Sequence, residues 1–136
     1  MSSKFLLKGF EVELFTGLLS GEHFGVAKDV IKEFDDFVNE PDHRNLEFIT
    51  SPKQKYDDLK TAILLPRSRL RRWLAAKDLT ILPCSTLSLG DSKEFQRSDP
   101  LNSYHDLIEK NYGTKVVTTS VHINLGIDEL SSLFAA

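Results

Sequence analysis

The sequence predicts an α+β fold in which an antiparallel sheet packs helices against one face and presents a polar cleft on the other. Three stretches, residues 9–15, 45–50 and 120–126, alternate apolar and polar side chains. Alternate residues of a strand share one face, so each stretch carries one apolar row and one row of acids, an imidazole or amides. This pattern is typical of a sheet that is buried on one face and solvated on the other.

The polar rows carry the candidate functional residues. The first stretch contributes Glu11 and Glu13, and the second contributes Glu47. The third contributes His122, with Ser120 and Asn124 two residues away on the same row. Polar rows of antiparallel strands also commonly just face water, and that alternative stays open at this point. Two features favour a functional face: apolar residues bracket the acidic row, and none of the three motif cores places a lysine in it.

The two glutamates of the first stretch are close enough to repel each other. Residues two apart in a strand lie roughly 6–7 Å apart on one face. At an effective dielectric constant near 20, the repulsion of two such charges is of order 2–3 kcal/mol. A divalent cation would neutralise it, so we interpret this face as half of a metal–nucleotide site.

Length and composition fit a single globular domain. The chain has 136 residues, and its net charge of −3 offers no basic surface for nucleic acid. The single cysteine, Cys84, excludes an internal disulfide and is typical of a reducing compartment. No apolar run is long enough to cross a bilayer, and the first residues lead into a strand pattern rather than a signal peptide. We therefore expect a soluble cytoplasmic protein without membrane or nucleic-acid partners.

The first half of the chain predicts two strand–helix pairs. Residues 5–16 are rich in strand formers, and residues 26–39 carry apolar side chains at helical spacing until Glu40-Pro41 stops the helix. Residues 44–50 form the second strand. A helix over 54–77 follows, which Pro66 should kink or split.

The second half predicts a strand over 79–86, a polar loop over 88–103, a helix over 104–112 and a last strand over 115–125. His105 is expected on the surface of the short helix, which Gly113 ends. A further amphipathic helix begins near Asp128 and the sequence stops about two turns later, which is marginal for an isolated helix. We therefore expect residues 1–136 to be the N-terminal part of a longer catalytic domain.

The three motifs, residues 9–13, 46–52 and 120–126, resemble those of glutamate–cysteine ligase, in the cyanobacterial-type branch of the carboxylate–amine ligases. Their order and spacing match over nearly the whole chain, which corresponds only to the N-terminal portion of such an enzyme. The resemblance implies a glutamine-synthetase-like fold, here incomplete, with an antiparallel sheet curved around the site. It also implies that the missing portion supplies nucleotide-binding residues and further metal ligands, so that residues 1–136 alone are inactive.

By resemblance, the substrates are glutamate, cysteine and ATP, and the cofactors are Mg²⁺ and ATP. ATP would phosphorylate the γ-carboxylate of glutamate, and the cysteine amine would attack the acyl phosphate to give γ-glutamylcysteine, the first step of glutathione synthesis. Mg²⁺ suits such a site because it favours hard oxygen ligands. A carboxylate–amine ligase with another amine acceptor, and a non-catalytic module that binds a metal or a partner, remain as alternatives.

The resemblance also assigns roles to individual side chains. It implies that Glu11, Glu13 and Glu47 bind metal and that Glu47 alternatively contacts the substrate amine. His122 and Glu47 are the implied catalytic residues, with His122 against a metal or a phosphate. The implied substrate-binding residues are Asn124, Ser120 and Arg97.

Overall fold

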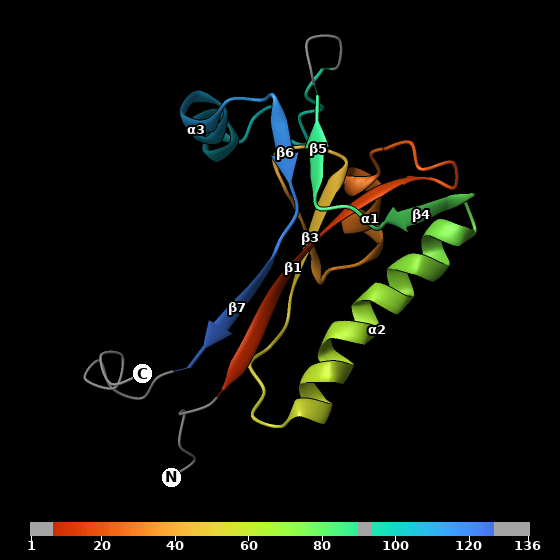
Figure 1. Ribbon diagram of the computed structural model, residues 1–136, viewed down its shortest axis with the longest axis vertical. Coiled ribbons are helices and arrows are strands. Elements are labelled where there is room, and N and C mark those ends of the chain that lie inside the picture. The colour runs from red at the N-terminus through yellow and green to blue at the C-terminus, as the bar shows by residue number, and fades with distance from the viewer. Residues whose placement is uncertain (1–6, 90–93, 127–136) are drawn as a thin grey trace.

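The computed structural model describes residues 7–89 and 94–126 (Figure 1). The helix expected near Asp128 lies outside these residues. Three helices and seven strands follow one another in the described chain. In order they are β1 (Lys8–Leu18), α1 (Ala27–Glu33), β2 (Phe37–Asn39), β3 (Asn45–Ile49), α2 (Tyr56–Ala75), β4 (Leu79–Leu82), β5 (Thr86–Ser88), α3 (Ser103–Tyr112), β6 (Val116–Thr118) and β7 (Val121–Leu125).

Strand β1 is the centre of a five-stranded antiparallel sheet in the order β2-β3-β1-β4, with β7 also paired to β1. Along one edge β1 pairs with β3. Along the other it pairs with β7 through residues 8–12 and with β4 through residues 15–18. One strand thereby aligns three others, and the predicted α+β antiparallel fold is confirmed.

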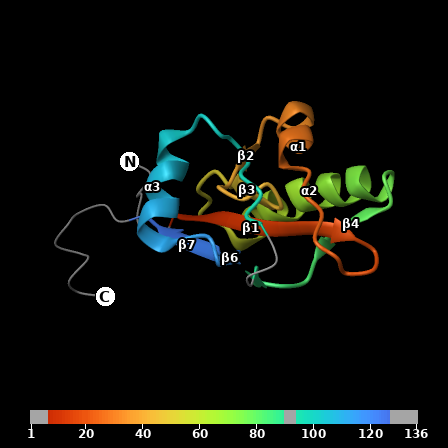
Figure 2. The same cartoon turned by 90° about the horizontal axis from the view of Figure 1, so that it is seen from above.

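The main core lies between this sheet and helices α1 and α2, which Figure 2 shows on one side of β1. Leu70 and Leu74 of α2 are fully buried against the apolar row of β1 and β3, which includes Val12 and Phe48. Burying one such side chain contributes about 1.5–3 kcal/mol, so this contact fixes which face of the sheet turns inward. The polar rows of β1 and β3 consequently face away from α1 and α2.

A second layer covers part of the polar side. Strands β5 and β6 form a two-stranded sheet of their own, and their Leu87 and Val117 pack against Phe15 at the far end of β1. In Figure 1 this pair and α3 gather at one end of the molecule. The expected strand over 115–125 is therefore two strands in different sheets, because the chain crosses between layers at Thr119-Ser120.

The expected helix over 26–39 is too long. Helix α1 ends at Glu33, and Phe37–Asn39 form β2 instead. Phe37 pairs with Phe48 in the β2–β3 register, and their rings lie 5.5 Å apart. Helical spacing could not reveal this, because the apolar contact that decides it comes from another strand.

Helix α2 runs through Pro66 without being split, contrary to one of the two expectations for that residue. His105 also differs from the prediction, since only 2% of it is exposed. The apolar row of β7 is the third difference. Ile123 and Leu125 are 64% and 65% exposed, because no described element covers that part of the sheet.

Among the described residues, no helix combines the length and the apolar character needed to cross a membrane. The expected cytoplasmic location stays a prediction.

Candidate metal-binding and active site

The registers of β1 with β3 and β7 bring the three polar rows together. Glu13 lies opposite Glu47 on β3, and Glu11 lies opposite His122 on β7. Directly opposite residues of antiparallel strands have their side chains on the same face, about 4.5–5.5 Å apart at Cβ. The side chains that the sequence assigned to a common face therefore do share one.

Glu11 is tied to β7 through both of its carboxylate oxygens. One oxygen lies 3.1 Å from Nδ1 of His122, and the other accepts a hydrogen bond of 3.1 Å from Nδ2 of Asn124. Nε2 of His122 lies 2.9 Å from the hydroxyl of Ser120. The chain Ser120–His122–Glu11–Asn124 orients the imidazole, and 53% of that side chain remains exposed.

Glu13 leads a separate cluster of three carboxylates. Its Oε2 accepts a 2.9 Å hydrogen bond from the backbone N–H of Ser120. One carboxylate oxygen from each of Glu13, Glu40 and Glu47 lies within 4.8 Å of the other two. Three convergent hard oxygen donors are the ligand type that Mg²⁺ prefers. The residues present therefore fit a divalent cation, with Glu40 beside two of the predicted ligands. The metal-binding role of Glu11 stays a prediction.

The electrostatics of the carboxylate cluster penalise its negative charge. Burial, reinforced by the charges of Glu13, Glu47 and Glu11 and by a side-chain hydrogen bond with Glu47, raises the pKa of Glu40 to about 8. Burial also raises the pKa of Glu47, again reinforced by Glu11 and Glu13. Crowded carboxylates that cannot all ionise are typical of functional sites. A bound cation would reverse this effect, because it favours the ionised forms.

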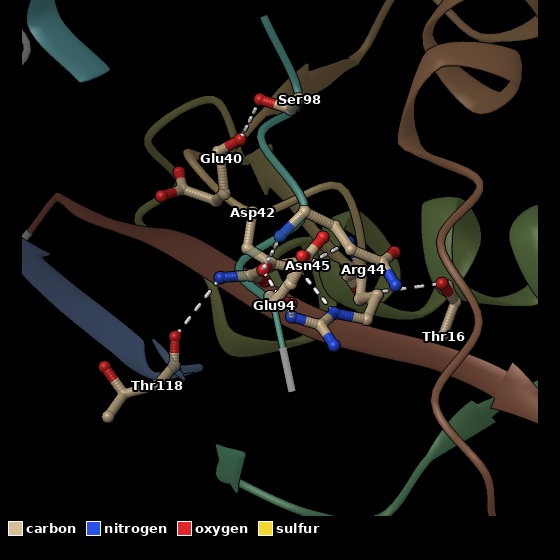
Figure 3. Close-up of polar contacts among 9 residues, drawn as sticks. Thr16, Glu40, Asp42, Arg44, Asn45, Glu94, Ser98 and Thr118 are labelled. Carbon is tan, nitrogen blue, oxygen red and sulfur yellow. Dashed lines mark hydrogen bonds and ion pairs between the residues drawn. The ribbon is translucent and has the colours of Figure 1, made fainter. Parts of the chain in front are cut away.

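The sequence pattern did not point to Glu40, which stands directly before Pro41 where the predicted helix stops. It follows β2 directly and precedes Pro41, so it belongs to neither of the alternating stretches. Its carbonyl oxygen accepts a hydrogen bond from the hydroxyl of Ser98 (Figure 3). The only sequence clue was an acidic residue seven positions before Glu47, and Pro41 between them argues against a helix that would place both on one face.

A cavity of about 300 Å³ opens beside the carboxylate cluster. Glu13 and Glu40 line one side, and apolar or aromatic side chains such as Phe95, Ile108 and Tyr112 line the other. A volume of this size is at the lower end for small-ligand sites. The cavity combines negative groups with an apolar wall, which suits a small molecule carrying an ammonium group.

Arg97 is the one predicted site residue that the structure leaves apart from this group. Its guanidinium forms ion pairs with Asp106 and Glu109 of α3, and donates a 3.2 Å hydrogen bond to the carbonyl of Asn102. These contacts fasten the loop to the helix that follows it. They give Arg97 a structural use, and its role toward a substrate stays a prediction.

Comparisons with known proteins agree with this fold. The chain is similar over 95% of its length to the crystal structure of a bifunctional glutathione synthetase from Pasteurella multocida, with a TM-score of 0.64 and 21% sequence identity. The chain spans 18% of that protein's length. At this identity the likeness establishes the fold alone. No curated protein sequence gave a significant match.

The family comparison covers almost the same stretch. The model of glutamate–cysteine ligase family 2 matches residues 7–135, which include all three polar rows and Glu40. The match therefore spans every residue of the carboxylate cluster and of the Glu11–His122 chain. The chain belongs to glutamate–cysteine ligase family 2.

Proposed function

We propose that the chain supplies part of the active site of an ATP-dependent carboxylate–amine ligase that forms γ-glutamylcysteine from glutamate and cysteine. The observation that carries the proposal is the convergence of Glu13, Glu40 and Glu47 on the open face of the sheet. Family membership supports the ligase class. The identity of the substrates, the cofactors Mg²⁺ and ATP, and the roles below are part of the proposal.

In this proposal, Glu13, Glu40 and Glu47 hold Mg²⁺. The ion, when bound, screens the charge of the transferring phosphoryl group. Glu47 has the alternative role of contacting the substrate amine. Glu11, which accepts a hydrogen bond from Asn124, holds the imidazole of His122 on the same face, where it would hydrogen-bond to a phosphate oxygen.

The reaction balances as two displacements. An oxygen of the γ-carboxylate of glutamate attacks the terminal phosphorus of ATP, and the bond from that phosphorus to ADP breaks. The amine nitrogen of cysteine then attacks the acyl carbon, phosphate leaves with its bonding electrons, and the amine loses a proton. The protein contributes chiefly by positioning the reactants and stabilising charge, as phosphoryl transfer generally requires.

The cavity beside Glu13 and Glu40 is the proposed place for the amine acceptor. Its carboxylates would attract an ammonium group, and its apolar wall would contact a short side chain. None of the cavity-lining residues in the described chain is specific for a thiol, so an acceptor other than cysteine is a second candidate.

The test measures ADP formation by the full-length protein. ADP should accumulate with Mg²⁺, glutamate and cysteine together, and should not accumulate when either amino acid is omitted. A panel of small amino acids replacing cysteine then ranks the acceptors by kcat/KM. Acceptor-independent ADP formation, or the absence of ADP formation with every amine, would reject a carboxylate–amine ligase.

The matched variant is Glu47→Gln, which keeps the size of the side chain and removes its charge. The proposal expects it to abolish most turnover while the protein stays folded. Unchanged turnover would remove Glu47 from the site.

A further inference from the structure

An ion pair lies almost completely buried two residues beyond Glu40. Asp42 is 0% exposed and Arg44 is 4% exposed. Nε of Arg44 lies 2.7 Å from Oδ1 of Asp42, and one terminal guanidinium nitrogen lies 2.6 Å from Oδ2. The backbone N–H of Arg44 also donates to Oδ1, at 2.9 Å. This is a bidentate pair, the geometry in which arginine and carboxylate bind most specifically.

Such a pair is a weak source of stability, since desolvating both charges offsets most of their attraction. We therefore expect the pair to serve by holding neighbouring segments in place. Both side chains bond within the turn and to the segment at residues 94–96, rather than to the carboxylate cluster. They do not touch the oxygens that would bind a cation.

The pair fastens the turn after β2 to the segment that precedes α3. The N–H of Gln96 donates to Oδ2 of Asp42 at 3.0 Å, and the N–H of Ser98 donates to the carbonyl of Pro41 at 2.9 Å. The hydroxyl of Ser98, a fully buried residue, completes the contact by donating to the carbonyl of Glu40. Glu40 is thus held by its own carbonyl and by both residues that follow it.

The same turn is also fixed to the sheet. The carbonyl of Arg44 accepts a 3.0 Å hydrogen bond from the N–H of Thr16 on β1. The side-chain amide of Asn45 donates to the carbonyl of Thr118 at the end of β6, at 3.2 Å. Figure 3 shows these contacts around the turn, with the Asp42 carboxylate directed at the Arg44 guanidinium and the Glu40 carboxylate pointing elsewhere. The turn and the first residue of β3 are therefore joined to β1, β6 and the loop.

We infer that Asp42, Arg44 and Ser98 are positioning residues that hold Glu40 within reach of Glu13 and Glu47. The inference rests on the proposed metal site. In the metal-free protein an ionised Glu40 is repelled by the other carboxylates, because it faces them in a partly buried place. A turn anchored on three sides opposes the displacement of Glu40 from the cluster and keeps this third ligand in position, as precise metal sites require.

The test titrates Mn²⁺, as a paramagnetic substitute for Mg²⁺, into the full-length protein and follows free Mn²⁺ by EPR. The double variant Asp42→Asn with Arg44→Met removes the pair without leaving one charge buried alone. Ser98→Ala removes the hydrogen bond to the Glu40 carbonyl and leaves the pair intact. Loss of supporting contacts around metal ligands typically costs 10–100-fold in affinity. We expect the dissociation constant of the double variant to rise by about that factor, and that of Ser98→Ala to rise less.

Arg44→Lys is the conservative variant. Lysine keeps the charge but lacks the planar fork that bonds a carboxylate twice, so its Mn²⁺ affinity should fall between wild type and the double variant. Arg69→Met is the control, since it breaks the Arg69–Asp36 ion pair, in which both side chains are about one third exposed. It should leave Mn²⁺ affinity unchanged. Thermal unfolding of each variant separates a loss of metal affinity from a loss of folding.

Mn²⁺ affinity within twofold of wild type in the folded variants would overturn the inference while leaving the metal site standing. If the double variant does not fold, Ser98→Ala decides by the same criterion. If wild type shows no saturable Mn²⁺ binding, or Glu13→Gln binds as tightly as wild type, the proposed function fails and the positioning role fails with it.

Discussion

Glu40 and Asp42 lie two residues apart in one turn, yet the protein treats their charges in opposite ways. Asp42 is completely buried and receives donors from the Arg44 guanidinium, the Arg44 N–H and the Gln96 N–H. Glu40 is partly buried among other carboxylates, and its pKa is raised to about 8. Asp42 shows that this turn can supply a buried carboxylate with a cationic partner and hydrogen-bond donors, whereas Glu40 has no such cationic partner among the groups that shift its pKa.

The lack of a cation among the groups that shift the pKa of Glu40 is therefore informative. A structural carboxylate has its hydrogen-bond donors and cationic partner inside the protein. A ligand-binding carboxylate lacks such a cationic partner until the ligand binds. Glu47 belongs with Glu40 in this respect, because neither an arginine nor a lysine is among the groups that shift the pKa of either carboxyl.

The largest expected effect comes from removing the partner of Asp42. Arg44→Met leaves a carboxylate buried without its cation, and such changes typically cost about 3–5 kcal/mol in the free energy of unfolding. Denaturant unfolding of the full-length protein measures it. Adding Asp42→Asn should recover most of the loss. A cost below about 1 kcal/mol for Arg44→Met would show that Asp42 does not depend on its partner.

Removing a carboxylate from the cluster should lower activity without lowering stability, in contrast to Arg44→Met. Glu13→Gln or Glu47→Gln should lower kcat/KM for ligation by about 100-fold or more, because a metal ion contributes several kcal/mol of charge stabilisation in the transition state. The melting temperature of the metal-free protein should stay the same or rise, since one of the repelling charges is gone. A fall in stability with retained activity would place these glutamates in the structural class with Asp42.

The metal-free protein should lose stability as the pH rises from about 4.5 to about 8. In this range the unfolded chain has released the proton of Glu40, whose ordinary pKa is 4.5, and the folded chain still holds it. The contribution of Glu40 protonation to the free energy of unfolding is therefore complete below pH 4.5 and is lost as the pH rises through the folded pKa of about 8. Melting temperature measured against pH should show this decline without Mg²⁺.

Glu40→Gln supplies the control for that experiment, because glutamine does not titrate. It should flatten the decline, and saturating Mg²⁺ should reduce it in the wild type. A pH profile that is identical in wild type and Glu40→Gln would mean that Glu40 has an ordinary pKa.

The smallest effect is expected at the Arg69–Asp36 ion pair. The two side chains are 35% and 34% exposed, so water competes for both charges. Arg69→Met should change the free energy of unfolding by about 0–1 kcal/mol, as is usual for exposed pairs. Denaturant unfolding beside Arg44→Met tests whether burial, rather than ion pairing as such, separates the two pairs. Equal costs would contradict this.

The sequence predicted the shared face because a strand has a period of two, which holds wherever the strand lies. Glu11, Glu13, Glu47 and His122 followed from that period once three alternating stretches were recognised. Their meeting also required the β1–β3 and β1–β7 registers, which no local pattern determines. The order and spacing of the stretches, read from the sequence, carried the family resemblance.

What escaped prediction depends on contacts between distant segments. Glu40 becomes a site residue only because Phe37–Asn39 pair with β3 and because Ser98 holds its carbonyl. Arg97 looked like a free arginine in a loop, but Asp106 and Glu109 lie one turn apart on the helix that follows and bind it. The spacing of those two acids was visible in the sequence, while the approach of the loop was not.

The central claim is that Glu13, Glu40 and Glu47 form one cation site. Mn²⁺ binding followed by EPR, in wild type and in the three single variants to glutamine, tests it most directly. The account predicts one saturable site in the wild type and a dissociation constant at least tenfold higher in each variant, about 1.4 kcal/mol per ligand lost. Tight binding that survives all three substitutions would contradict it.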